Sequence, residues 1–146
     1  MSNTTIKLYR HPLSGHSRRV ELLLSLLQLR VELGDVDLAN GVQKTPAFLA
    51  LNAFGQVPVL DDGGTVLADS NAILVYLASK YDDGRWLPHD PAGAAAVQRW
   101  LSVAAGEVAF GPATARLISV SNAPYDARGY RHLCVHRACT GGQCHA

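Results

Sequence analysis

The stretch from Asn52 to Ala72 constrains the fold more than any other part of the sequence. Val57-Pro58-Val59-Leu60 is a short apolar run typical of a buried strand. Pro58 cannot donate to a strand ladder, so it marks the head of the strand and is a candidate for a cis peptide bond. Asp61-Asp62-Gly63-Gly64 is a tight-turn signal, and Thr65-Val66-Leu67-Ala68 then predicts the second strand of a hairpin.

A helix is predicted directly after this hairpin. Asp69 and Ser70 have the side chains that cap helix N-termini. Apolar residues then recur at helical spacing as far as Tyr81. The pattern therefore predicts a helix over residues 70–81.

The chain before the hairpin predicts a strand, a helix and a second strand. Residues 6–9 alternate apolar and polar side chains, and residues 31–36 form the next strand candidate. The helix between them is expected over residues 17–28, with Ser17 as its N-cap. Two strands joined by a helix predict a parallel pair with a right-handed connection. Thr45-Pro46 then predicts the start of a short helix through Leu51.

The helix over residues 17–28 carries two apolar stripes, which predicts burial on two sides. The first stripe consists of Val20, Leu23, Leu24 and Leu27. The second consists of Leu22, Leu26 and Leu29. We expect the first stripe to face the sheet and the second to face another helical layer.

Composition indicates a globular chain without an obvious charged partner. The sequence has 146 residues, of which 48% are hydrophobic, and a formal net charge of +1. This balance gives no reason to propose nucleic acid or a membrane as a partner. The first residues lack a signal-peptide pattern, and the longest apolar run is too short to span a bilayer. A cytoplasmic location is expected.

The segment F-G-Q-V-P-V-L, a short turn and then D-S-N-A-I resembles the glutathione-binding half of cytosolic glutathione transferases. The pattern of that family is N-P-x-G-x-V-P-x-L followed by E/D-S-x-A-I. The resemblance extends over roughly residues 5–120. It implies an α/β fold, a thioredoxin-like βαβαββα domain followed by a truncated all-α segment.

The resemblance also implies a domain organisation. Residues 1–82 correspond to the thioredoxin-like domain, 83–90 to a linker, and 91–127 to the start of the all-helical domain. The first helix there is expected to start near Pro91 and to run into Gly111-Pro112, with a weaker segment at 113–120. Residues 128–146 have no periodicity and predict an irregular tail, because the further helices of the family are missing.

The cysteines do not predict a metal site. Cys134, Cys139 and Cys144 all lie in the predicted tail, near several histidines. Their spacings differ from the C-x2-C pattern of zinc sites, so no metal is expected.

Ser14 is the catalytic candidate that the resemblance implies. Residues 13–20 resemble the S-x-x-x-R segment of the serine-type transferases, in which the serine hydroxyl donates a hydrogen bond to the sulfur of glutathione. Such a bond favours the thiolate and lowers the pKa of the thiol. The N-terminus of the following helix acts in the same direction. Ser17 is the competing serine, to which we give the structural role of helix cap.

The resemblance implies that the other site residues bind glutathione. The backbone of Val57, turned outward by a cis Pro58, pairs with the cysteinyl part of the ligand. Ser70 binds the γ-glutamyl carboxylate at the free N–H groups of its helix. Asp69 faces the ammonium group of the same residue, and Gln56 also contacts the glutamyl part. Gln43 and Lys44 occupy the place of a pair that holds the glycyl carboxylate.

The predicted function is conjugation of the glutathione thiolate to an electrophilic small molecule, with glutathione as co-substrate and no further cofactor. The family forms homodimers. For this short chain we expect weak activity, and we expect its uncovered leucines to cause association. A non-catalytic glutathione-binding module is the alternative. A thiol-disulfide oxidoreductase is disfavoured because residues 12–17 contain no cysteine. His11 and His16 flank Ser14, but no G-x-S-x-G segment accompanies them to indicate a hydrolase.

Overall fold

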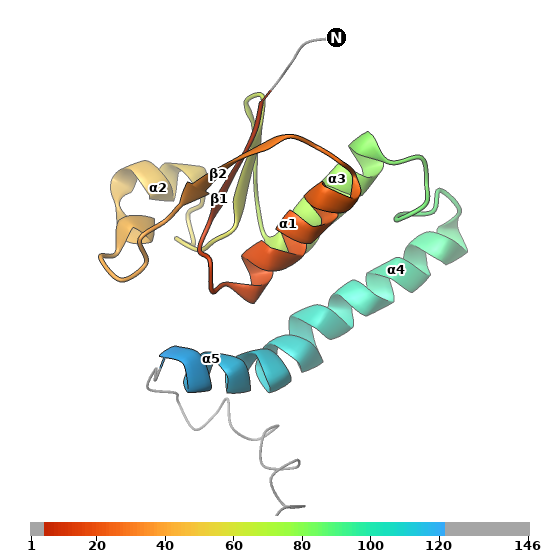
Figure 1. Ribbon diagram of the computed structural model, residues 1–146. Helices are drawn as coiled ribbons and strands as arrows, with labels where there is room; N and C mark the ends of the chain where they lie inside the picture. The colour runs from red at the N-terminus through yellow and green to blue at the C-terminus, as the bar shows by residue number, and fades with distance from the viewer. Residues whose placement is uncertain (1–4, 122–146) are drawn as a thin grey trace, which may run out of the picture. The chain divides into compact units, whose positions relative to one another are not determined.

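A computed structural model of the protein describes residues 5–121 (Figure 1). The chain divides into two compact units, with the division after Ala94, and each is described by itself. The strands of the first unit are β1 (Ile6–Arg10), β2 (Val31–Asp35), β3 (Val59–Asp62) and β4 (Thr65–Ala68). Its helices are α1 (Gly15–Leu26), the 3-10 turn η1 (Val42–Lys44), α2 (Pro46–Leu51) and α3 (Ser70–Tyr81). The predicted βαβαββα order is confirmed.

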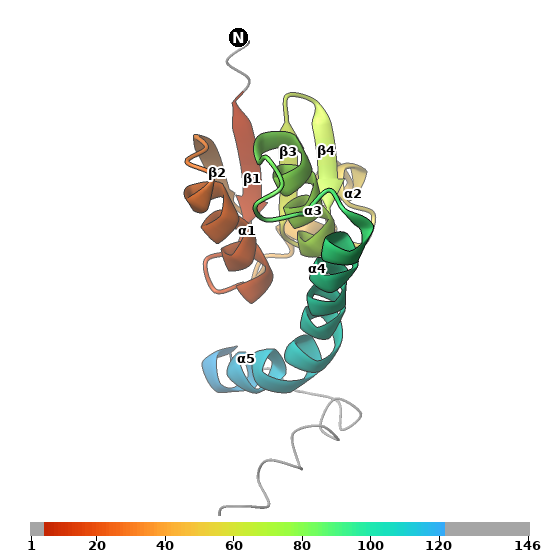
Figure 2. The same cartoon turned by 90° about the vertical axis from the view of Figure 1, so that its right-hand side faces the viewer.

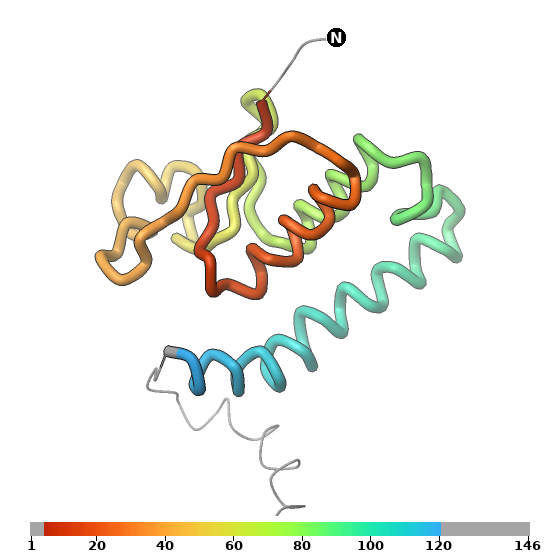
Figure 3. The backbone as a smooth tube through the Cα atoms, in the orientation of Figure 1, coloured from red at the N-terminus to blue at the C-terminus, as the bar shows by residue number. Residues whose placement is uncertain are grey.

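The four strands form one sheet in the order β2-β1-β3-β4. β1 and β2 are parallel, with Leu8 opposite Leu33, and α1 makes the connection between them, as the tube in Figure 3 shows. β3 runs antiparallel to both of its neighbours and places Leu60 opposite Leu8. The mixed α/β sheet of the predicted thioredoxin-like fold is therefore confirmed.

Helices cover both faces of the sheet, with α1 and α3 on one face and α2 on the other (Figures 1 and 2). The larger core cluster lies under α1 and α3, and it consists of Ile6, Leu8, Val20, Leu23, Leu24, Leu60, Ile73 and Leu77. A smaller cluster under α2 consists of Val36, Phe48 and Val59. The first apolar stripe of α1 thus faces the sheet as predicted, because its side chains supply much of the larger cluster.

The second stripe of α1 does not behave as one surface. Leu29 packs against the larger core cluster. Leu22 is 60% exposed and Leu26 is 51% exposed. Leu29 therefore joins the core that the first stripe already faces, and the predicted burial of Leu22 and Leu26 against another helical layer is wrong.

The hairpin differs from the predicted one by a shift of its first strand. β3 begins at Val59, so Val57 and Pro58 precede the strand, and it extends through Asp62. The turn consists of Gly63 and Gly64, with φ angles of 60° and 96°. A two-residue turn with positive φ at both positions suits glycine, which leaves the two aspartates in the strand.

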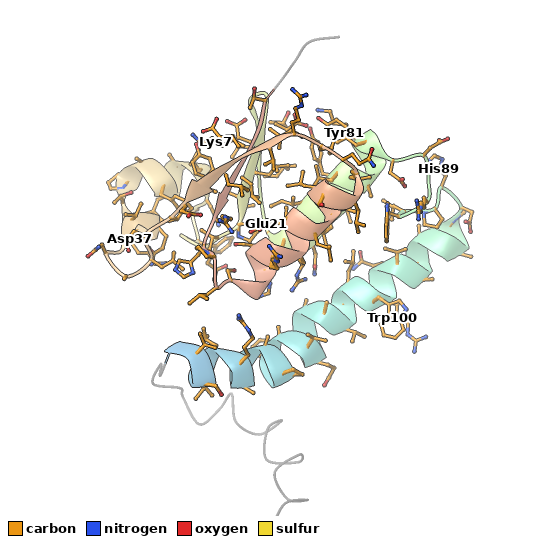
Figure 4. The ribbon with its side chains drawn as sticks, viewed as in Figure 1. Lys7, Glu21, Asp37, Tyr81, His89 and Trp100 are labelled. Carbon is orange, nitrogen blue, oxygen red and sulfur yellow. The ribbon has the colours of Figure 1, made fainter. Side chains whose placement is uncertain are left out.

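Asp62 is a buried residue of β3 that connects the sheet to α3 through hydrogen bonds, and not the turn residue that the sequence predicts. Its side chain is inaccessible to solvent. Oδ2 accepts hydrogen bonds from Lys80 Nζ at 2.6 Å, Tyr81 Oη at 2.7 Å and Tyr76 Oη at 2.8 Å. Figure 4 labels Tyr81 at the end of α3. Burial alone would raise the pKa of Asp62, but these bonds outweigh it and hold the pKa below its ordinary value.

The cap of α1 is also not the predicted one. The helix begins at Gly15, and its N-cap is Ser14, whose Oγ accepts from the Ser17 N–H at 3.2 Å. Ser17 lies inside the helix, fully buried, and its Oγ accepts from the His11 N–H at 3.4 Å. Ser17 keeps a structural role, but the role of cap belongs to Ser14.

The described part of the second unit is helical. α4 (Pro91–Val103) starts where the sequence predicts, and a π-helical segment η2 (Ala104–Ala113) leads into α5 (Thr114–Ser121). Pro112 lies inside this helical segment, so the break predicted at Gly111-Pro112 is wrong. A wide turn accommodates a proline that has no N–H to donate. Trp100 projects from α4 and is exposed (Figure 4).

Some sequence predictions fall on residues that the structure does not describe. The irregular tail at 128–146, with Cys134, Cys139 and Cys144, lies outside residues 5–121. The domain boundaries stay predictions. Among the described residues, no helix is both long and apolar enough to span a membrane. The same residues contain no cluster of three potential metal-ligating side chains.

Candidate functional site

The register of the sheet gathers the predicted site segments at one end. Tyr9 near the end of β1 pairs with Val59 at the start of β3, and Val59 also pairs with Ala68 at the end of β4. The segments that begin α1, precede β3 and begin α3 therefore emerge at the same edge. The Val36 N–H donates to Arg10 O at 2.7 Å, which brings the end of β2 to this edge as well. Six of the predicted site residues lie in the first three of these segments: Ser14, Gln56, Val57, Pro58, Asp69 and Ser70. Gln43 and Lys44 lie in η1, which follows β2 along the chain.

Ser14 lies at the N-terminus of α1 and is partly accessible to solvent. Its oxygen accepts from the Ser17 N–H, which occupies a lone pair but leaves the hydroxyl proton available. The partial positive charge of the helix N-terminus acts at the same place. Ser14 can therefore donate a hydrogen bond to an anion while it caps the helix.

The Val57–Pro58 peptide bond is cis, as the sequence suggested. Pro58 is buried, whereas Gln56 is exposed. The segment before them is held by Asn52, whose Nδ2 donates to Gln56 O at 2.9 Å. The Val57 backbone thus leads into β3 from a loop that the Asn52 side chain holds in place.

Lys44 is joined to this loop, and Gln43 is turned away from solvent. Lys44 Nζ donates to Phe54 O at 3.0 Å, and its ammonium has further donors for a ligand. Gln43 Nε2 points toward Leu38 O at 3.4 Å. Gln43 Oε1 is buried and has no hydrogen-bond partner among residues 5–121. Of the two predicted glycyl-carboxylate ligands, Lys44 is the better placed for a charged group.

The start of α3 has fewer open N–H groups than the sequence suggests. Asp69 is the N-cap, with φ of 71°, and its Oδ1 accepts from the Asn71 N–H at 2.9 Å and the Ala72 N–H at 3.0 Å. These two donors are therefore already occupied. Ser70, the first residue of the helix, is 4% exposed, and its own hydroxyl and N–H are the groups suited to a carboxylate.

His16 and Arg19 connect the starts of α1 and α3, and neither residue is among those predicted for the site. His16 Nδ1 lies 3.3 Å from Ser70 Oγ and 2.9 Å from Arg19 Nη2. Arg19 Nη1 donates to Asn71 Oδ1 at 2.6 Å. Partial burial, followed by the neighbouring Arg19 charge, lowers the pKa of His16, and Asp69 opposes this effect. No local signal could find the contacts of His16 with Ser70 and of Arg19 with Asn71, because these partners are 54 and 52 positions apart.

This arrangement suits an extended anionic ligand with a nucleophilic or hydrogen-bonding centre. Donors at the start of α1 and the start of α3 lie on either side of the loop that leads into β3. Lys44 adds a positive charge beyond this loop. A peptide-like molecule can pair with the Val57 backbone as an added strand while its charged ends meet Ser70 and Lys44.

Known proteins are similar to this chain in sequence and in structure. Residues 13–80 match the family model described as the glutathione S-transferase N-terminal domain. The chain is 48% identical over 99 residues to glutathione S-transferase 3 of Zea mays. The matched segment covers 67% of this chain and 45% of that protein. The chain thus spans less than half the length of this relative.

Solved structures of glutathione transferases are also similar to this chain. A delta-class glutathione transferase of Nilaparvata lugens superposes with a TM-score of 0.73 at 34% identity, covering 92% of this chain and 64% of the other. Human glutathione transferase theta-2 in complex with glutathione superposes with a TM-score of 0.63 at 36% identity, covering 68% of this chain and 42% of the other.

Proposed function

We propose that this chain binds glutathione and presents its thiolate to an electrophilic small molecule, because residues 13–80 match the model of the glutathione S-transferase N-terminal domain. The observation that carries the proposal is the convergence of the α1 start, the cis Val57–Pro58 loop and the α3 start at one edge of the sheet. These segments come from distant parts of the sequence, and each presents a group that matches a different part of glutathione.

In the proposed mechanism, Ser14 stabilises the thiolate. Its hydroxyl donates a hydrogen bond to the glutathione sulfur, while its oxygen continues to accept from the Ser17 N–H. The N-terminus of α1 adds partial positive charge beside the sulfur. Both effects lower the pKa of the bound thiol, which supplies more nucleophile at neutral pH.

The rest of the ligand is held by charge and backbone pairing. The γ-glutamyl carboxylate binds the hydroxyl and N–H of Ser70, and Asp69 attracts the ammonium group. The backbone of Val57 pairs with the cysteinyl part, and Gln56 contacts the glutamyl part. Lys44 binds the glycyl carboxylate, with Gln43 in a supporting position behind it. No cofactor beyond glutathione takes part in this scheme.

The partners and location follow from the same proposal. The second substrate is a small electrophile, and the protein acts in the cytoplasm. A second copy of the chain is the proposed protein partner. Phe54 supports this, because it is 79% exposed while Asn52 Oδ1 accepts from its N–H and Lys44 Nζ donates to its carbonyl oxygen. An exposed aromatic ring on a braced loop suits contact between protomers.

Two measurements on the full chain test the function. Isothermal titration with glutathione measures binding, and the consumption of glutathione by an activated chloroarene measures conjugation. We expect Lys44→Ala to weaken binding and Arg30→Ala to leave it unchanged, because Arg30 precedes β2 at the opposite edge of the sheet. Binding without conjugation would reduce the function to that of a glutathione-binding module. Equal binding by both variants would remove Lys44 from the site.

A further inference from the structure

The contact between His16 and Ser70 joins the two helix starts that form the candidate site. Ser70 is almost completely buried, and His16 Nδ1 lies 3.3 Å from its Oγ. The same nitrogen lies 2.9 Å from Arg19 Nη2. One ring atom of His16 therefore meets both a cation and the hydroxyl that is expected to receive a carboxylate.

The chemistry of Arg19 fixes the protonation of this ring. A guanidinium group only donates hydrogen bonds, so Nδ1 of His16 must be unprotonated to accept one. His16 is then neutral, with its proton on Nε2. Because Nδ1 has no proton, the hydroxyl of Ser70 is the donor in the contact between the two side chains, and it shares the single lone pair of Nδ1 with Arg19. In this state the hydroxyl proton of Ser70 is directed at His16 and is not available to an incoming anion.

We propose that His16 is a positioning residue that controls which way the Ser70 hydroxyl donates, and thereby the affinity of the site for a carboxylate. In the neutral state, His16 accepts the Ser70 proton. When His16 is protonated, the hydrogen bond from Arg19 is lost. Nδ1 then donates to Ser70 Oγ, and the Ser70 proton turns to the ligand. The inference rests on the proposed function, because it assumes that the carboxylate belongs to glutathione.

The charges around His16 set the balance between these states. Arg19 on α1 opposes protonation, and Asp69 at the start of α3 favours it. A carboxylate bound at Ser70 adds a further negative charge beside the ring, so binding raises the pKa of His16. By thermodynamic linkage, protonation of His16 must then tighten binding by the same factor. Affinity for the ligand is expected to rise as the pH falls through the pKa of His16.

Binding of S-methylglutathione tests this directly, because the blocked sulfur cannot ionise. In wild type, the Kd is expected to fall about three- to tenfold between about pH 7.5 and 5.5, which corresponds to a coupling of about half to one pKa unit. His16→Gln offers neutral hydrogen-bonding groups at the same position, and its Kd should change less than about twofold over this range. His89→Gln, in the segment between α3 and α4, is the matched control and should keep the wild-type profile.

A second measurement needs no variant. The titration of the His16 Cε1–H signal by NMR should shift to a higher midpoint when S-methylglutathione is added, and free His16 should show the shifts of the Nε2–H tautomer. Identical pH profiles for wild type and His16→Gln, or an unmoved His16 midpoint on binding, would overturn the positioning role alone. A wild-type chain that fails to bind at every pH would overturn the proposed function, and this inference with it.

Discussion

Replacing Asp62 with alanine should destabilise the first unit more than any surface substitution. The carboxylate is fully buried and receives hydrogen bonds from Lys80, Tyr81 and Tyr76 at 2.6 to 2.8 Å. Removing one partner from a buried charged network typically costs about 3–5 kcal/mol. The lysine and the tyrosines retain access to water, so hydration of these groups offsets part of the lost free energy. We therefore expect a decrease of about 3 kcal/mol in the free energy of unfolding, out of a typical total of about 5–15 kcal/mol.

Urea unfolding followed by far-UV circular dichroism measures this loss, provided that the m-value is unchanged. Asp61→Ala is the matched control, because Asp61 is the preceding residue of the same strand and its Oδ1 accepts from the Gly64 N–H in the turn. The control should lose less than about 1 kcal/mol. A double-mutant cycle with Tyr81→Phe isolates the coupling between the two side chains. Equal losses for Asp61→Ala and Asp62→Ala would refute the assigned role of the network.

The same network predicts how stability depends on pH. Since the pKa of Asp62 is lowered in the folded protein, its contribution is complete above the ordinary carboxyl pKa of about 3.9. The contribution is lost as the pH falls through the lower folded pKa. Wild type should therefore lose stability below about pH 4 more steeply than Asp62→Asn. Parallel acid profiles for the two proteins would contradict the pKa direction.

Three further changes test other parts of the structure. Ser14→Asn should keep the helix cap but raise the pKa of the bound glutathione thiol, measured by thiolate absorbance against pH; an unchanged pKa would remove the Ser14 hydroxyl from the mechanism. Gly55→Ala should destabilise the chain and weaken glutathione binding in calorimetry, because φ is +58° and the added Cβ would lie 2.6 Å from Gln43 O. Wild-type affinity and melting temperature would show that this loop tolerates the shift. The double change Leu22→Gln and Leu26→Gln should alter stability by less than about 1 kcal/mol and reduce dye binding and association, because both side chains are mostly exposed. A large loss of stability in urea would show that these leucines are covered in solution.

The order of the elements followed from local patterns, whereas several residue roles did not. Turn glycines, the apolar stripe of α1 and the Thr45-Pro46 start are local signals, and the structure confirms the elements that they predict. The cap of α1 was misassigned because Ser14 and Ser17 have equal capping chemistry. The two serines differ only in the folded structure, where Ser17 is fully buried.

The buried role of Asp62 could not be predicted for a similar reason. Its partners lie 14 to 19 positions later in the chain, on a helix whose packing against the sheet brings them to the carboxylate. An Asp-Asp-Gly-Gly sequence indicates a turn but does not say which aspartate stays in the strand. The contact of His16 with Ser70 could not be predicted for the same reason, because the two residues lie on different helices that only the folded chain brings together. Local sequence thus indicated where the site lies, and tertiary packing determined which side chains meet there.

The antiparallel pairing of β1 with β3 has a consequence for the order of folding. β1, α1 and β2 form a unit of near neighbours in sequence, which can assemble early because the loops it closes are short. The pairing of Leu8 with Leu60 closes a far longer loop. Only that step brings the start of α3 beside the start of α1. A nascent chain would therefore gain half of its sheet, with Ser14 at the start of α1, before the two helix starts of the ligand site came together. Ligand would select the molecules in which this last long-range closure is complete.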